Sequence, residues 1–238
     1  MISWPVARAA AREKLRSPAI LALGVCFAGA SGLGARAGAL LEAFAGFGLV
    51  FLLLLTLALG AGLLSDELAS GHAQLVLLRP ITRAAWVGGR LIGAGIALAA
   101  VTAGGWAVAA VASLGSGRAI PLSALAVLPL AVLWAFAWLS VLTALGVVLP
   151  GWTNGGALVV SAIAWATLRQ SLPGLLGHPE WAAPAAELST YLGPQDPLKL
   201  AVDRHAAGPA LYDLCWVFLG WLVAVLLFNR RELSRRRP

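Results

Sequence analysis

Apolar stretches alternate with short polar segments along the whole chain. The apolar stretches occupy residues 18–35, 39–64, 84–115, 121–149, 153–168 and 211–228. The hydrocarbon core of a bilayer is about 30 Å thick, so a helix needs roughly 20 apolar residues to cross it. Stretches of about this length predict six transmembrane helices in an all-α membrane protein, built as a single domain over residues 1–238.

The polar segments predict helices outside the bilayer. Residues 1–17 have Pro5 near their start and contain four basic residues, which favours a helix lying in the cytoplasmic membrane surface. A basic tail that only sets topology is the alternative. Residues 65–83 predict a short cytoplasmic crossbar, residues 169–208 one or two short outer helices, and residues 229–238 a basic tail.

Three features of the spans add detail to this layout. The first apolar stretch is longer than the apolar core of a cleaved signal peptide, so we expect it to be retained. Arg90, near the start of the third span, is expected to extend its side chain to the headgroups by snorkelling. Pro129 is expected to kink the fourth span, unless the first turns of that span lie outside the bilayer.

Composition agrees with membrane insertion and indicates an orientation. The chain is 60% hydrophobic and only 11% charged, whereas a soluble domain is about 25% charged. The 17 basic residues lie at the ends of the apolar stretches, which is typical of topology signals and not of a nucleic-acid surface. Twelve of the 17 face the cytoplasm if the N-terminus does, so both termini are predicted to be cytoplasmic. The many Arg, Ala and Gly residues suggest a bacterial protein of the inner membrane.

Side chains that could carry chemistry are scarce in the predicted spans. The stretch Gly29–Gly32 matches the GxSG of intramembrane serine proteases, but no span contains a His to accept the proton of Ser31. Cys26 and Cys215 lie in separate apolar stretches without metal-ligand spacing. The spans are interpreted as empty of groups that could bind a coupling ion, with Glu42 at an outer span end as the nearest. This pattern predicts neither an enzyme, a metal site nor an ion-driven carrier.

Energy for transport would therefore come from a partner. The chain has no G-x-x-x-x-G-K-[ST] loop to hold nucleotide phosphates, so ATP and Mg²⁺ are expected in a separate ATPase subunit. That subunit needs a cytoplasmic contact, and residues 65–83 form the only sizeable inner segment between spans.

This segment resembles the ABC-2 type permeases. In that family an acidic residue after the second span is followed by a Gly, a Leu-rich turn, and then Pro, an aliphatic residue, Ser or Thr, and Arg. The matching residues are Glu67, Gly71, Leu75 to Leu78, Pro80, Ile81, Thr82 and Arg83, whereas His72 stands where the family usually has Thr. The whole layout of spans and polar segments is also similar to that of the family.

The resemblance implies that residues 65–83 form a coupling helix that docks on the ATPase. The implied contact residues are Asp66, Glu67, Gly71, Leu75, Leu78, Arg79, Pro80 and Arg83. We expect Leu75 and Leu78 to form an apolar tooth, with the charged residues around it. Local chemistry agrees, since Gly71 can end a cytoplasmic extension of the second span, Pro80 can stop the next helix and Thr82 can cap the third span.

Asp66 and Glu67 would lie in the last turn of that extension, where the helix dipole disfavours anions. A compensating cation is therefore expected nearby. Arg79, Arg83 or the basic N-terminal helix could supply it within the chain, and the ATPase could supply it from outside.

The resemblance further implies a permease subunit that exports a substrate, working with two ATPase copies and a second permease, either an identical copy or a sister chain. The alternative is a similar subunit that transmits ATPase motion to another membrane or periplasmic protein without moving a solute. Small residues that could pack two permeases together are Gly29, Gly32, Gly46, Gly48, Gly155 and Gly156. The sequence names no substrate-binding residue.

Overall fold

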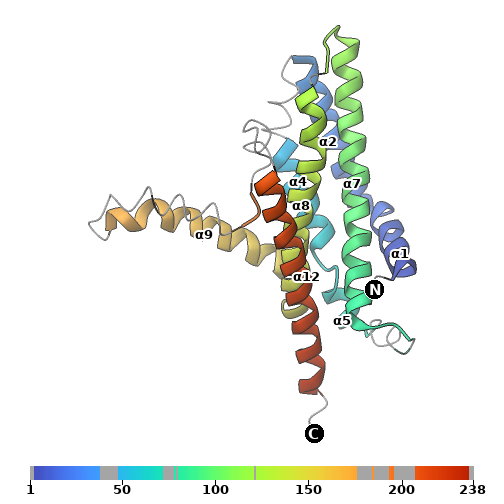
Figure 1. Ribbon diagram of the computed structural model, residues 1–238, viewed down its shortest axis with the longest axis vertical. Helices are drawn as coiled ribbons and strands as arrows, with labels where there is room; N and C mark the ends of the chain where they lie inside the picture. Colours follow the sequence, from blue (N-terminus) through green and yellow to red (C-terminus); the bar gives the residue numbers. More distant parts are fainter. Residues whose placement is uncertain are drawn as a thin grey trace.

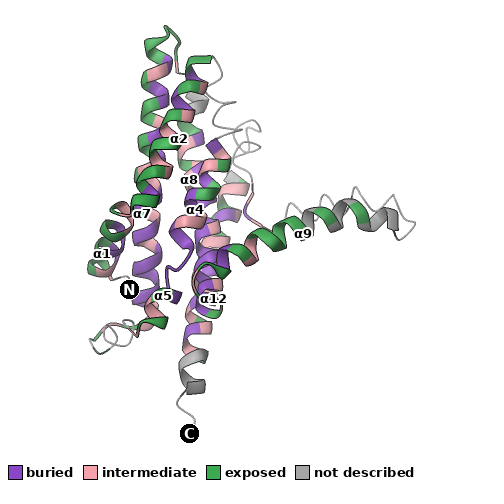
Figure 2. Ribbon diagram, turned by 180° about the vertical axis from the view of Figure 1, so that it is seen from behind, coloured by how far each residue is buried: buried purple, intermediate pink, exposed green. Residues whose placement is uncertain are grey.

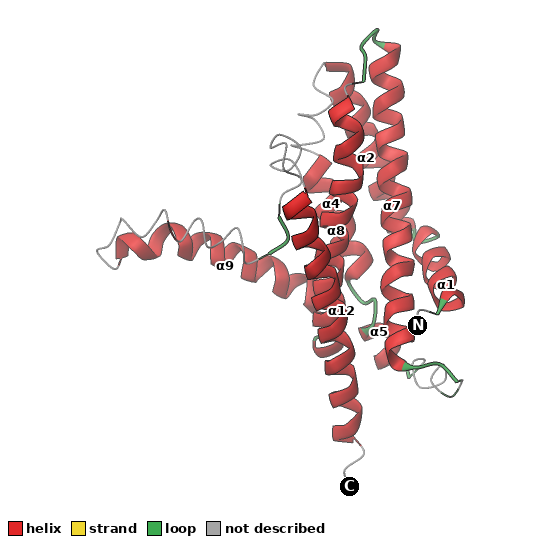
Figure 3. Ribbon diagram, viewed as in Figure 1, coloured by secondary structure: helices red, strands yellow, loops and turns green. Residues whose placement is uncertain are grey.

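The regular structure in the described part of the chain is entirely helical (Figure 3). A computed structural model describes residues 3–37, 48–71, 80–120, 122–175 and 207–235, and the isolated positions 78, 184 and 193–195. Its helices are α1 (Trp4–Leu15), α2 (Pro18–Ala37), α4 (Leu49–Gly60), α5 (Ser65–Ala69), α7 (Arg83–Gly115), α8 (Leu122–Val148), α9 (Thr153–Leu175) and α12 (Ala207–Arg235). The predicted all-α fold is confirmed.

Five helical segments are long and apolar enough to cross a membrane. They are Pro18–Ala37, Leu49–Ala69, Arg83–Gly115, Leu125–Val148 and Gly208–Arg230. The predicted span at 153–168 is not among them, because the apolar part of α9 reaches only from Thr153 to Ala164. α9 also projects sideways from the bundle, and its side chains at 159–164 are exposed (Figures 1 and 2). The six-span layout therefore stays a prediction.

The helices α2, α4, α7, α8 and α12 form a bundle (Figure 1). Their shared core contains Ile20 and Phe27 of α2, Leu52, Leu55 and Leu59 of α4, Leu91 and Leu98 of α7, and Ala131 and Leu139 of α8. Many aliphatic side chains point outward instead, among them Val25, Leu33, Val111 and Phe218. An outer surface of this kind suits a lipid environment.

α8 and α12 run in the same direction. Ser140 of α8 donates a hydrogen bond to the Trp216 carbonyl of α12 over 3.0 Å, and further along both helices Val147 and Phe228 share a buried cluster. α8 continues through Pro129 as one helix. Parallel neighbours need a connection that returns toward the starting side, and the connection here includes α9.

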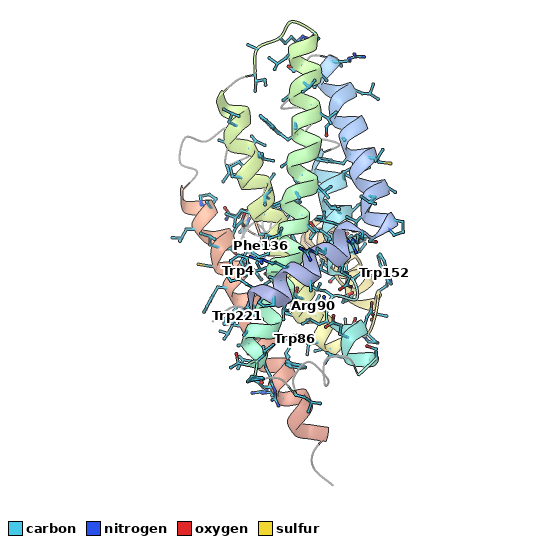
Figure 4. The ribbon with its side chains drawn as sticks, turned by 90° about the vertical axis from the view of Figure 1, so that its right-hand side faces the viewer. Trp4, Trp86, Arg90, Phe136, Trp152 and Trp221 are labelled. Carbon is cyan, nitrogen blue, oxygen red and sulfur yellow. The ribbon has the colours of Figure 1, made fainter. Side chains whose placement is uncertain are left out.

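α1 packs on α7 through small residues. It crosses α7 near the start of that helix (Figure 4), with Ala7, Ala10 and Ala11 buried. A Cβ atom on Gly93 would lie 2.6 Å from the Ala10 Cβ, and one on Gly89 would lie 2.9 Å from the Ser3 carbonyl oxygen. This Gly-x-x-x-Gly contact, which the sequence analysis did not identify, fixes α1 directly against the bundle.

The end of the second span contains a break. α4 ends at Gly60, Gly62 adopts a φ of +72°, and the separate helix α5 follows from Ser65. Gly71, with a φ of +73°, comes directly after the Ser70 C-cap of α5, so it does follow a helix end as predicted, but the helix is the separate α5 and not an extension of the second span. The predicted cap of α7 is also confirmed, because Thr82 accepts a hydrogen bond from the Ala85 N–H over 3.2 Å.

The glycines proposed for a permease dimer have different surroundings. Gly32 faces Val108 and Gly155 faces Leu57 within the same chain, whereas a Cβ on Gly29 or Gly156 would meet no atom within 4 Å. Gly48 precedes α4, and Gly46 lies outside the described residues. Only Gly29 and Gly156, of those with described surroundings, are open to a second chain.

Candidate functional site

A buried arginine joins three helices at the end of the bundle that carries residues 65–83. Arg90 of α7 is 8% exposed, and Figure 4 shows it beside α1. Its guanidinium contacts Glu13 of α1 over 2.8 Å and also contacts Glu67 of α5. The expectation that Arg90 snorkels to the headgroups is wrong, because two carboxylates surround the guanidinium within the protein.

The two carboxylates depend on Arg90 to different degrees. The Glu67 side chain is 13% exposed, whereas that of Glu13 is 58% exposed. A carboxylate that is nearly removed from water needs a paired cation, but an exposed one is solvated without it. Arg90 therefore stabilises mainly the position of α5, and Glu13 adds a weaker link to α1.

Lys14 and Asp66 complete a charge cluster, which consists of Glu13, Lys14, Asp66, Glu67 and Arg90. Burial lowers the pKa of the Lys14 ammonium, and Arg90 lowers it further, while Glu13 and Asp66 act in the opposite direction. Lys14 is thus turned toward the protein, although a lysine on a surface helix would ordinarily face water.

The first turn of α5 contains both acidic residues. Asp66 and Glu67 were expected in the last turn of an extended second span, but the break at Gly62 gives them a helix of their own. α5 has only five residues, so both acidic residues lie within one turn of each of its ends and a helix dipole does not decide their stability. The expected compensating cations do come from within the chain. Lys14 of the basic N-terminal helix interacts with Asp66, as one of the expected alternatives proposed, whereas Glu67 is paired with Arg90, a residue not considered for this role.

α5 is also fixed to other parts of the bundle. The Ser65 hydroxyl accepts a hydrogen bond from the Gly151 N–H over 2.9 Å, which joins α5 to the turn before α9. Leu68 packs on a buried cluster that includes Trp86 and Phe228, whose ring centroids are 5.5 Å apart. α5 therefore has contacts with α7, with α8 and with the turn between α8 and α9.

After α5 come an exposed apolar residue, Leu78, and an arginine, Arg83, that is hydrogen-bonded within the bundle. Leu78 is 83% exposed, and Pro80 is exposed as well. Arg83 was expected in a charged collar, but its Nη1 donates to the Asn229 Oδ1 of α12 over 3.3 Å. The predicted contact residues Leu75 and Arg79 lie outside the described residues.

Two polar residues inside the bundle were missed by sequence reasoning. Asn154 is fully buried, and its Nδ2 donates to the Gly60 carbonyl over 3.2 Å and to the Leu142 carbonyl over 3.3 Å. Asp213 of α12 is fully buried, and its Oδ1 accepts from the Gln195 N–H over 2.8 Å. The interpretation that the predicted spans contain no ionisable group is therefore wrong. Asp213 lies within the apolar stretch 211–228, so the sequence itself contained the signal.

The comparison with known proteins assigns no family. No protein-family model matches the chain, and a search of curated proteins finds no significant match. The class of protein is therefore defined by the structure, whose five long apolar helices are compatible with a multi-pass membrane protein.

Proposed function

We propose that the chain is the transmembrane permease subunit of an ABC-2 type transporter, which couples ATP hydrolysis in a separate ATPase subunit to export of a substrate. In this proposal the chain crosses a bacterial inner membrane six times, with α9 part of the fifth crossing and both termini in the cytoplasm. A second permease and two ATPase copies complete the transporter.

The observation that supports this proposal best is the exposure of Leu78 between the described residues on either side of it, 65–71 and 80–83. Leu78 is 83% exposed on a segment whose two ends are both anchored, at α5 through Glu67 and at α7 through the Thr82 cap and Arg83. An exposed leucine on such a segment offers apolar surface that a partner can bury. A force on Leu78 would reach α7 through both anchors.

Leu78→Asp tests the ATPase contact. A charge placed in a desolvated pocket costs about several kcal/mol, which is enough to abolish binding in the micromolar range, worth about 8 kcal/mol. The tagged variant should reach the membrane at the wild-type level. The ATPase subunit and its ATP hydrolysis activity should be lost from the purified sample. Ser116→Asp is the matched control, because Ser116 is exposed in the turn at the other end of α7.

Wild-type recovery of an active ATPase with Leu78→Asp would contradict the docking role. Leu78→Asp is a cleaner variant than any change at Glu67, because Glu67 is bound to Arg90 and its loss would alter the fold as well.

The topology has an independent test. Cysteines introduced at Ser70 and Arg235 should be protected from an impermeant thiol reagent in intact cells, and a cysteine at Glu187 should react. The reverse pattern would place residues 65–83 outside the cell, where no ATPase could bind them.

Transmission of motion without transport is the second function left open by the sequence. Purified permease and ATPase, reconstituted together, distinguish the two. Stimulation of ATP hydrolysis by a small molecule or lipid favours transport, whereas stimulation that requires another membrane or periplasmic protein favours transmission.

A further inference from the structure

A groove with two arginines follows the exposed face of α1. Its volume is about 590 Å³, and its lining residues are Trp4, Pro5, Arg8, Ala9 and Arg12. Residues four apart share one face of a helix, so Trp4, Arg8 and Arg12 form a row. Trp4 is 58% exposed, and both arginines are exposed. The groove therefore offers one indole and two guanidinium groups to a ligand from outside.

The described acidic residues near α1 do not line this groove, and they interact with other basic residues. Glu13 contacts Arg90, and the negative charge of Asp66 raises the pKa of Lys14, so both acidic residues interact within the charge cluster. In the described part of the chain neither Arg8 nor Arg12 forms an ion pair. Their positive charges are thus available to an anion.

The opposite face of α1 fixes the direction in which the groove opens. Ala7 and Ala10 pack on Gly93 of α7, and the Ser3 N–H donates to the Ala85 carbonyl over 3.4 Å. α1 lies across the first turns of α7, at the level where that helix begins (Figure 4). Because α7 is one of the membrane-crossing candidates, the groove faces outward near a membrane surface.

We propose that this groove binds the headgroup of an anionic phospholipid, with the lipid phosphate between Arg8 and Arg12 and the indole of Trp4 beside it. Guanidinium groups bind phosphate oxygens through paired, charge-assisted hydrogen bonds. Tryptophan is favoured at the boundary between headgroups and acyl chains, and clustered basic residues at a membrane surface attract anionic lipids.

The groove ligand would act on more than α1. Ala7 and Ala10 pack on Gly93 of α7, and Arg90 of α7 binds Glu67, so a lipid that holds α1 in place also supports α5 through α7. The proposal depends on the membrane location in the proposed function but not on the ATPase. Its test therefore uses the purified chain alone, and a failed lipid test leaves the ATPase contact unaffected.

Native mass spectrometry of the purified chain in detergent tests the site. Phosphatidylglycerol is titrated against phosphatidylcholine, and the dissociation constant of the first bound lipid is measured for each. We expect phosphatidylglycerol to bind about tenfold more tightly than phosphatidylcholine, and Arg8→Gln and Arg12→Gln each to weaken it about fivefold. Arg16→Gln is the matched control, because Arg16 is exposed at the end of α1 but does not line the groove.

Several results would overturn the proposal. Equal binding of the two lipids by the wild type excludes an anion site, and this comparison needs no variant. Equal losses with Arg16→Gln and Arg12→Gln show diffuse charge attraction instead of a groove. Binding of inorganic phosphate, measured by calorimetry, with the same affinity as the lipid assigns the site to a free anion.

Two controls accompany the arginine variants: a double lysine variant that keeps the charge, and a measurement of folding. The Arg8→Lys and Arg12→Lys double variant keeps both charges but loses the planar guanidinium, so its affinity should lie between those of the wild type and the double glutamine variant. Circular dichroism and gel filtration show whether each variant keeps the wild-type fold. A double lysine variant that binds as weakly as the double glutamine variant, with the fold intact, still supports recognition by guanidinium groups, whereas wild-type binding by the double glutamine variant overturns the site.

Discussion

Replacement of Arg90 by methionine should destabilise the protein strongly, because it leaves a buried carboxylate without its cation. Arg90 is 8% exposed and the Glu67 side chain is 13% exposed, so the pair is largely removed from water. Methionine keeps much of the length of the arginine side chain and its contacts with apolar neighbours. The variant therefore removes the charge more than the packing.

The magnitude follows from the burial of each partner. Removal of one member of a buried ion pair costs about 3–5 kcal/mol, because the other charge is left uncompensated. The link to Glu13 contributes less, since its side chain is 58% exposed and exposed pairs are worth about 0–1 kcal/mol. If Arg90 instead extended to the headgroups, as the sequence suggested, the same change would cost about 0.5 kcal/mol or less.

A double-mutant cycle separates these explanations. The free energy of unfolding is measured in detergent micelles for Arg90→Met, Glu67→Gln and the pair together, and Glu13→Gln serves as the exposed control. The double variant should be more stable than Arg90→Met alone by about 2 kcal/mol, because it no longer contains a buried lone charge. Additive losses, or a Glu13→Gln loss as large as that of Arg90→Met, would refute the buried pair.

Two further predictions concern α1. Gly93→Ala should destabilise the protein by about 1–3 kcal/mol in thermal unfolding, because the added methyl group would press on Ala7 and Ala10. Gly104→Ala is the control: its Cβ meets no atom within 4 Å, so the change should be neutral or slightly stabilising. The free energy of unfolding of the wild type, relative to that of Lys14→Met, should rise with pH between the lowered pKa of Lys14 and 10.5. The reason is that in this pH range the unfolded state binds more protons than the folded state. A fall over that range would contradict the burial of the ammonium.

The sequence predicted the positions of the helices better than their contacts. An apolar stretch long enough to cross a bilayer can be identified without knowing what it packs against. Gly71 and Thr82 likewise affect helix ends only a few residues away in the chain. In a membrane protein both the lipid-facing and the core-facing sides are apolar, so hydrophobicity does not show which side packs. The packing of Gly89 and Gly93 on α1 was missed for this reason.

The charge cluster was missed for a different reason. Arg90 and Glu13 are 77 positions apart in the chain, and Glu67 joins them from α5, the separate helix that follows the break at Gly62. Considered alone, an arginine at the start of an apolar stretch is typical of a snorkelling residue. Only the placement of α1 and α5 reveals that carboxylates surround it.

The unequal exposure of the two glutamates suggests how a push on Leu78 would spread. Glu67 is nearly buried with Arg90, so α5 and α7 are expected to move together. Glu13 can exchange Arg90 for water at little cost, but Ala7 and Ala10 still hold α1 on Gly93. Loss of the Glu13 contact should therefore leave α1 in place, whereas a side chain at Gly93 should separate it from α7. If ATPase contact is transmitted through this unit, Gly93→Ala will uncouple hydrolysis from transport more than Glu13→Gln does, and the opposite order would show that the ion pair, not the small-residue packing, carries the motion.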